Sequence, residues 1–257
     1  MATLAEPLPG YGRDDRFFLT MAVVMALTMV AGFSLQFVMG RSSFGAPLLI
    51  HLHAVVFFGW VVLYLLQNVF VYRGVMGLHR TLGWIGAVWM AVMVVVGIYT
   101  TMTMVRRGAA PFFFEPSFFL VMNALIVIGF AGLTSAAILL RKRTDWHRRL
   151  HYCGMAMLTA PAFGRLLPAP LMIPWAGWGI FAATMIWPVI GIIADLRRTG
   201  RVHDSWWWGV ATMVLVQCAM SAIAYSDAGV ALYDAVTAGY PGAAVPPLDF
   251  APPPPMP

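Results

Sequence analysis

Long apolar runs separated by short polar segments recur along the 257 residues of this chain. The runs reach about 20 residues or more, which is the length that a helix needs to cross roughly 30 Å of hydrocarbon. Apolar and polar positions do not alternate within the runs, as they would in the strands of a membrane β-barrel. Because backbone groups in lipid must bond to one another, each run is predicted to be a helix. We therefore expect an all-α, polytopic bundle of seven transmembrane helices, at residues 17–39, 47–72, 82–105, 117–140, 150–172, 174–194 and 206–226.

The predicted organisation is one membrane domain with a segment before it and a tail after it. The three parts are a cytoplasmic N-terminal segment 1–16, the transmembrane domain 17–226 and an extracytoplasmic proline-rich tail 227–257. The first apolar run is too long for the core of a cleavable signal peptide, so we expect a membrane-anchored helix. In the tail, "DAGVALYDAVTAGY" predicts a short interfacial helix, and "PGAAVPPLDFAPPPPMP" predicts an extended and mostly disordered end.

The fifth apolar run differs from the others by its prolines. Pro161, Pro168 and Pro170 fall within it, and Pro174 follows it. A proline has no backbone N–H, so it frees a carbonyl that neighbouring groups in the bundle must satisfy. We therefore expect the fifth helix to be kinked and to pack inside the bundle.

Composition and charge place the chain in a membrane and orient it there. Apolar residues make up 61% of the chain and charged residues 10%, which is far from the average soluble domain. Basic residues cluster on one predicted side, at Arg13, Arg16, Arg73, Arg80, Arg141, Lys142, Arg143, Arg148, Arg149, Arg197, Arg198 and Arg201. The loops of the other side hold Arg41, Arg106 and Arg107. This asymmetry predicts a protein of the bacterial inner membrane with its N-terminus in the cytoplasm and its C-terminus outside.

Several function classes do not fit these features. The net charge of +6 is explained by topology beside anionic lipid, so the bilayer is the expected partner and nucleic acid is not implied. The single lysine, Lys142, lies in a predicted loop, so no retinal Schiff base is expected within the helices. The chain contains no Walker loop, no dinucleotide fingerprint and no zincin signature.

Three histidines lie where predicted helices begin at the basic side of the membrane. His147 and His151 are four residues apart and therefore share one helix face, and His79 lies at similar depth before the third helix. Two imidazoles from facing helices can hold the iron of a b-type haem from both sides. Of His147 and His151, the second is the expected partner of His79, because it lies further into the apolar run. Arg80, Arg148 and Arg149 are then expected to bind the haem propionates.

Two other interpretations of the three histidines stay open. His79, His147 and His151 can instead bind zinc or another transition metal, with one coordination position left for a substrate. They can also bind no cofactor, and only cap helices and contact lipid headgroups. In the zinc interpretation Asp145 lies close to the metal ligands in the sequence.

A second polar group is predicted near the outer side. His51 and His53 are two residues apart, so they point to nearly opposite faces of a helix and are not expected to share an ion. Arg165 lies in an apolar run and needs a partner, for which Glu115 is the acidic residue at matching depth. The pair is either a structural ion pair or part of a ligand site. We define this outer polar cluster as His51, His53, Glu115, Met122 and Arg165, with Asn123 beside it.

Three stretches carry a resemblance to a known family. They are "HLHAVVFFGW", "LHRTLGWIG" and "DWHRRLHYCGMAMLTAPAFGRLLP". They resemble the DUF2306-like group of bacterial membrane proteins, which has a similar histidine–arginine start to one helix and a later basic stretch that ends in Arg-Leu. The resemblance covers roughly residues 47–168 and implies no established activity.

A looser resemblance is to haem bundles of the cytochrome b561 type, in which four consecutive helices carry one axial histidine each. The resemblance implies one ligand from His51 or His53, one from His79 and one from His147 or His151. The intervening helix, 117–140, has no histidine, which departs from the family pattern. One haem at the cytoplasmic side fits this pattern, whereas a second, outer haem requires Met122 as a replacement ligand.

The leading hypothesis is a membrane protein that binds a b-type haem near its cytoplasmic face and serves electron transfer with a redox partner. One alternative is a small-solute transporter or a structural subunit of a membrane complex, without redox chemistry. Another alternative is a metal-dependent membrane enzyme. The sequence does not name an electron donor, an acceptor or a substrate.

Overall fold

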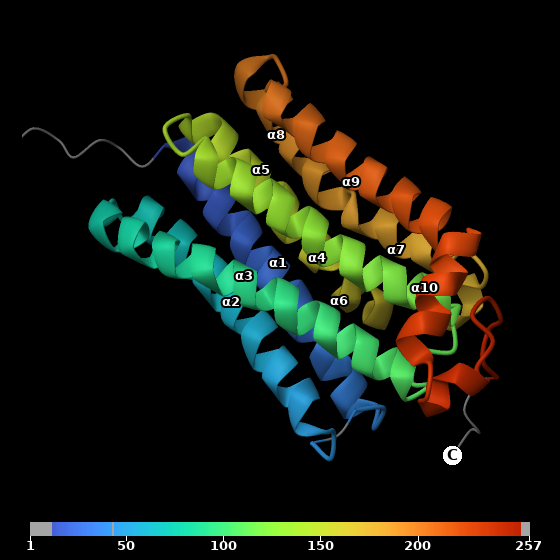
Figure 1. Cartoon of the computed structure of the whole chain (residues 1–257). Coiled ribbons are helices and arrows are strands. Elements are labelled where there is room, and N and C mark those ends of the chain that lie inside the picture. The colour runs from blue at the N-terminus through green and yellow to red at the C-terminus, as the bar shows by residue number, and fades with distance from the viewer. Residues whose placement is uncertain (1–11, 43, 253–257) are drawn as a thin grey trace, which may run out of the picture.

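The computed structural model describes residues 12–42 and 44–252, and within these ranges it contains helices and no β-strand. The five longest helices are α1 Arg13–Val38, α2 Leu48–Tyr72, α3 Met76–Arg106, α4 Pro116–Leu139 and α9 Asp204–Ala224. The shorter ones are α5 Thr144–Leu158, α6 Ala160–Leu166, α7 Ala176–Thr184, α8 Ile186–Thr199 and α10 Asp227–Thr237. Two 3₁₀ turns, η1 Ala169–Met172 and η2 Pro241–Ala244, complete the described elements. Figure 1 shows the long helices running side by side as one bundle.

Six helices of the described part are long and apolar enough to cross a membrane. They are α1, α2, α3, α4 and α9, together with α7 and α8 taken as one unit over Ala176–Thr199. The prediction of an all-helical, multi-pass membrane protein is thereby confirmed. The α7–α8 unit is interrupted at Met185, because Pro188 cannot donate the backbone bond that would continue the helix.

The fifth apolar run is broken into two helices, as its prolines predicted. α5 ends at Leu158, and α6 begins at Ala160 with Pro161 in its first turn. The two helices together lie along α1. Arg148 of α5 contacts Asp14 near the start of α1. The backbone carbonyl of Arg165 in α6 accepts from Gln36 near the end of α1. The broken unit therefore extends from one end of the bundle to the other.

The core of the bundle is built around α5 and α4. Every residue of α5 from Tyr152 to Leu158 is buried, and α4 is 56% buried over its most apolar stretch. Small residues let the helices approach, since a Cβ added at Gly154 would touch Thr134 and Phe130. The α2–α3 hairpin is only 17% buried in each helix, so most of its apolar surface is left for lipid.

The C-terminal segment is more ordered than the sequence predicted. The predicted interfacial helix exists as α10, but residues 241–252 fold back on the bundle instead of extending freely. The Tyr233 hydroxyl donates to the carbonyl of Gly242 at 3.0 Å, and the Ser117 backbone N–H donates to the carbonyl of Pro247 at 2.9 Å. The disorder prediction is therefore wrong for 241–252, and residues 253–257 lie outside the described part.

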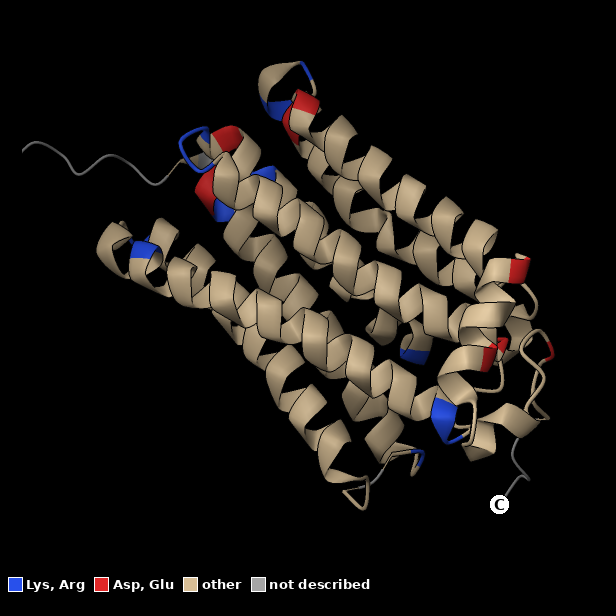
Figure 2. Ribbon diagram, viewed as in Figure 1, with Lys and Arg blue, Asp and Glu red and all other residues tan. Residues whose placement is uncertain are grey.

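Charged residues separate the two ends of the bundle, as Figure 2 shows. We call the end with the α2–α3, α4–α5 and α8–α9 loops the basic end; Figure 1 places these loops together. Its described cations are Arg16, Arg73, Arg80, Arg141, Lys142, Arg143, Arg148, Arg149, Arg197, Arg198 and Arg201. The opposite end holds Arg41, Arg106 and Arg107, and its described acids are Glu115, Asp227, Asp234 and Asp249.

Candidate functional site

The three histidines predicted to act together lie together at the basic end. The ring centroids of His79 and His147 are 6.2 Å apart, with the two ring planes at 85°. His151 lies one helical turn further along α5, and its ring centroid is 4.7 Å from that of His147. The ring that faces His79 is therefore His147 and not the expected His151, whose ring packs against His147.

Each ring of the facing pair is positioned by its own helix. His147 lies in the first turn of α5, and its Nδ1 is 2.8 Å from the carbonyl oxygen of Ala137 near the end of α4. This contact requires a proton on Nδ1 and leaves Nε2 as the nitrogen with a free lone pair. His79 lies in the first turn of α3, and its Nδ1 is buried without a hydrogen-bond partner.

The spacing of the facing pair suits a shared metal ion. Metal–imidazole nitrogen bonds are about 2.0–2.1 Å long, so two imidazoles on opposite sides of one ion have ring centroids about 6 Å apart. Histidines that bind a metal commonly donate the other ring N–H to a backbone carbonyl, as His147 does to Ala137. Across the described ranges, no group of three or more His, Cys, Asp or Glu side chains is arranged to hold a metal ion.

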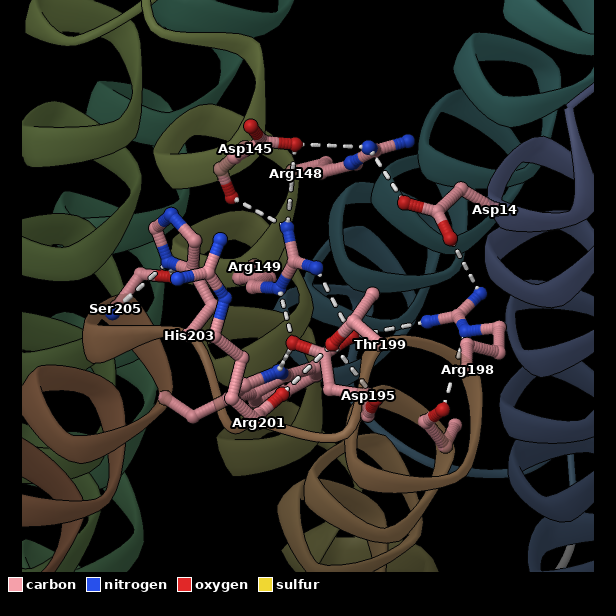
Figure 3. Close-up of polar contacts among 12 residues, drawn as sticks. Asp14, Asp145, Arg148, Arg149, Asp195, Arg198, Thr199, Arg201, His203 and Ser205 are labelled. Atoms are coloured by element: carbon pink, nitrogen blue, oxygen red, sulfur yellow. Dashed lines mark hydrogen bonds and ion pairs between the residues drawn. The ribbon is translucent and has the colours of Figure 1, made fainter.

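A network of ion pairs lies beside the histidines, and Asp195 of α8 is at its centre (Figure 3). Asp195 is 1% exposed, and its two oxygens accept from Arg149 Nε and Nη2, both at 2.9 Å. It also accepts from Arg198 Nη2 at 2.9 Å and from the indole N–H of Trp206 at 2.8 Å. The buried carboxylate is therefore fully satisfied by two guanidinium groups and one indole.

The same network ties the first helix to α5 and α8. Arg148 Nη2 donates to Asp14 at 2.6 Å and to Asp145 at 2.8 Å. Arg198 Nη1 lies 2.6 Å from Asp14 as an ion pair, although its N–H is not aligned for a hydrogen bond. Hydrogen bonding from Arg148 holds the pKa of the Asp145 carboxyl below its usual range.

The network bears on the arginines expected for haem propionates. Arg148 and Arg149 already bind carboxylates of the chain itself, so their donors face Asp14, Asp145 and Asp195. Arg80 is exposed and makes no ion pair with any described residue. Of the three arginines, Arg80 alone has its whole guanidinium free for an external anion.

The predicted pairing of Glu115 with Arg165 is wrong. Arg165 donates to the carbonyl of Pro161 at 2.8 Å and lies over the Phe33 ring at 4.1 Å, whereas Glu115 accepts from the Tyr225 hydroxyl at 3.3 Å. Arg165 therefore contacts α1, whereas Glu115 contacts the end of α9, because depth along an apolar run does not fix which neighbour a side chain faces. Burial of Glu115 raises the pKa of its carboxyl.

The other members of the outer polar cluster do not converge on one site. His51 Nε2 is 3.1 Å from the carbonyl oxygen of Phe44, and the His53 ring stacks on Phe57 at 4.2 Å. Met122 lines a small cavity with residues of α5, α6, α7 and α9, and neither histidine lines that cavity. A second, outer haem bound through Met122 therefore has no matching arrangement. Asn123 donates within α4 to the carbonyl of Phe119.

Sequence reasoning missed Asp14, Asp195 and Trp206, which hold the basic end together. One usable signal is present, because Asp195 follows the apolar run "MIWPVIGIIA" directly. An acid at such a position must find cations, and arginines occur at the same membrane depth. His203 caps α9, with its side chain accepting from the backbone N–H of Ser205.

Comparisons with protein-family models, curated proteins and solved structures gave no match for this chain. The class of the protein is therefore defined by its helices and its charge pattern. Six apolar helices of spanning length and a basic end with a buried ion-pair network define a multi-pass helical membrane protein.

Proposed function

We propose that this protein binds a b-type haem between His79 and His147 at the basic end of its bundle and serves electron transfer. The observation that carries the proposal is the 6.2 Å separation of the two rings, which matches two imidazoles on opposite sides of one metal ion. The two ring planes are nearly perpendicular, at 85°, as in an edge-to-face contact, so the proposal rests on the separation of the rings.

The chemistry of the donor set fits this group. Two neutral imidazoles are common axial ligands of haem iron, and His147 has its Nε2 free because Nδ1 contacts Ala137. His151 packs edge to face against His147 and holds its ring orientation. A six-coordinate haem supplies one-electron chemistry without a vacant coordination position for a substrate.

The arginines divide into two roles in this proposal. Arg80 follows His79 directly and has no carboxylate partner in the described part of the chain, so it binds a propionate. Arg148 and Arg149 hold α5 against α1 and α8 through Asp14 and Asp195, and they thereby fix the depth of His147.

The alternatives receive less support from the geometry. A zinc enzyme needs three converging ligands, and no such group occurs among the described His, Cys, Asp and Glu side chains. The buried Nδ1 of His79 has no hydrogen-bond partner, and a transporter or a structural subunit gives no reason for this.

We also propose seven membrane spans, with α5 and α6 as the fifth. Support comes from the contacts of α5 with the start of α1 and of α6 with its end. With seven spans, the basic end faces the cytoplasm of a bacterial cell and the end with α10 lies outside. A reporter fused after Pro257 should then be active only outside the cytoplasm.

Absorption spectra of single variants test the haem proposal. Protein from haem-replete cells should lose Soret absorption in His79→Ala and in His147→Ala, because each change removes an axial ligand. His151→Ala should retain haem with a shifted spectrum, since His151 contacts only the ring of His147. His203→Ala is the matched control, because it removes an imidazole of the same end that lies outside the cluster.

Two outcomes would contradict the proposal. Equal haem content in all four variants would show that these rings are not the ligands. Stoichiometric zinc in place of haem would favour the metal-enzyme alternative.

A further inference from the structure

Arg165 is a cation without a carboxylate partner in the half of the bundle away from the basic end. Within residues 12–42 and 44–252 it forms no ion pair, although Arg148, Arg149 and Arg198 at the basic end each form at least two. Its one side-chain hydrogen bond runs from Nη1 to the carbonyl of Pro161 on its own helix. Most of its guanidinium donors are therefore unused.

Aromatic rings hold this guanidinium and a nearby imidazole in fixed positions. Arg165 lies 4.1 Å over the ring of Phe33 in α1, and the carbonyl of Arg165 accepts from Gln36 at 3.1 Å. His53 in α2 stacks on Phe57 at 4.2 Å. Stacking on a ring face leaves the edge of a guanidinium free to donate to a planar or tetrahedral anion.

The two polar groups belong to one environment. Arg165 lies over the Phe33 ring, and Phe33 packs edge to face at 5.1 Å on Phe58 of α2, the helix that also carries His53. His53 Nδ1 is buried and has no hydrogen-bond partner. Each group thus has unused hydrogen-bonding capacity where α1, α2 and α6 meet.

No described carboxylate of this end pairs with Arg165. Arg41 lies in the exposed α1–α2 loop of the same end. The described acids of this end are Glu115 before α4, Asp227 and Asp234 on α10 and Asp249 after α10, and none of them forms an ion pair with Arg165. An uncompensated cation in an apolar span is costly, so the environment favours an external anion.

We propose that Arg165 and His53 bind the phosphate or carboxylate group of an anionic ligand between α1, α2 and α6. Arg165 donates two N–H groups in parallel to two oxygens of the anion, and His53 donates one from Nδ1. The proposal is independent of the haem proposal, because no residue is shared between the two sites.

The depth of the site favours the phosphate of a lipid headgroup as the source. Gln36 lies two residues before the end of α1, and His53 lies five residues after the start of α2. Both positions are within about one and a half helical turns of a helix end, and lipid phosphates lie near the ends of membrane helices. A soluble phosphate reaches the same position from the aqueous side.

Thermal unfolding of the full chain with two probes tests the proposal. One arm compares nanodiscs of phosphatidylglycerol with nanodiscs of zwitterionic phosphatidylcholine, and the other adds inorganic phosphate in neutral detergent. We expect at least one probe to raise the unfolding temperature of the unmodified protein by several degrees. The shift should disappear in Arg165→Gln and persist in Arg107→Gln, which removes an exposed arginine of the same end.

The arms distinguish the sources, and further variants keep the proposal falsifiable. A shift with phosphatidylglycerol alone identifies a lipid, and a shift with inorganic phosphate identifies a soluble anion. Arg165→Lys should retain part of the shift, because it keeps the charge but loses the planar fork. If Arg165→Gln does not fold, His53→Phe replaces it, since that change keeps the ring stack on Phe57 and removes the nitrogens. No shift with either probe, or an equal loss in Arg107→Gln, would overturn the proposal.

Discussion

The contact between α1 and the broken α5–α6 unit is made by different forces at its two ends. At the basic end, Asp14 of α1 binds Arg148 of α5 and Arg198 of α8, each at 2.6 Å. At the other end, a Cβ added at Gly32 of α1 would lie 2.8 Å from the backbone oxygen of Ala162 in α6. The contact at the basic end depends on ion pairs, and the contact at the other end depends on the lack of a side chain at Gly32.

The difference teaches which polar groups are structural. The arginines of the basic-end network are bound to carboxylates of the chain, so their charges serve the fold. Arg165 in α6 and His79 in α3 have unused polar atoms, although both lie against packed helices. Unpaired buried polar groups are candidate positions for an external ligand.

The largest expected effect is at Asp195. Asp195→Asn should lower the free energy of unfolding by about 3–5 kcal/mol, because it leaves the buried guanidinium of Arg149 without its counter-charge. Chemical or thermal unfolding in detergent measures the change. The control is Asp204→Asn, which alters an exposed acid in the first turn of α9. Equal effects of the two changes would contradict a structural role for the network.

A smaller effect is expected at the other end of the same contact. Gly32→Ala should destabilise the bundle by about 1–3 kcal/mol, because the new methyl group meets the backbone of Ala162, which cannot rotate away. The matched control is Gly132→Ala in α4, where an added Cβ has nothing within 4 Å. That change should be neutral or slightly stabilising, since alanine favours a helix over glycine. Destabilisation of both variants by the same amount would rule out the close-approach explanation.

Two carboxyl groups should give opposite pH dependences at the two ends. The pKa of Asp145 is lowered, chiefly by its hydrogen bond from Arg148, so its contribution is present above its ordinary pKa and is lost as the pH falls through the folded value. Asp145→Asn should therefore lower the unfolding temperature slightly at neutral pH, and the difference should vanish in acid. If the difference in unfolding temperature did not depend on pH, the carboxylate charge of Asp145 would not contribute to stability.

Glu115 should behave in the opposite sense. Burial raises the pKa of its carboxyl, so the folded protein favours the protonated form and loses stability as the pH rises from the ordinary value through the folded one. Glu115→Gln should then raise the unfolding temperature slightly at neutral pH and leave it unchanged in acid. A lower unfolding temperature at neutral pH would mean that the carboxylate has a cationic partner.

The fold was largely predictable because membrane helices leave a strong signal in the sequence. Length and hydropathy predicted the spanning helices, and Pro161 predicted the break between α5 and α6. The tail was not predictable from its prolines, because its order depends on contacts such as that of Tyr233 with Gly242. Composition reports local preference, whereas these contacts depend on how distant segments meet.

The depth of the candidate-site residues in the membrane was predictable from the sequence, but the neighbour that each side chain faces was not. The position of His79, His147 and His151 near helix starts on the basic side correctly predicted that they lie together. Depth alone wrongly paired Glu115 with Arg165, because the rotation of each helix about its axis is set by packing. Asp14 and Asp195 are separated by most of the chain, so only the folded bundle brings them to the same arginine, Arg198.

The most direct test of the central claim is the haem content of the purified protein. A reduced-minus-oxidised absorption spectrum of the full chain from haem-replete cells should show a low-spin, six-coordinate b-type haem at one per chain. This result is expected because His79 and His147 lie at the separation of two axial ligands. Protein that is folded by thermal unfolding criteria but shows no Soret absorption would contradict the account.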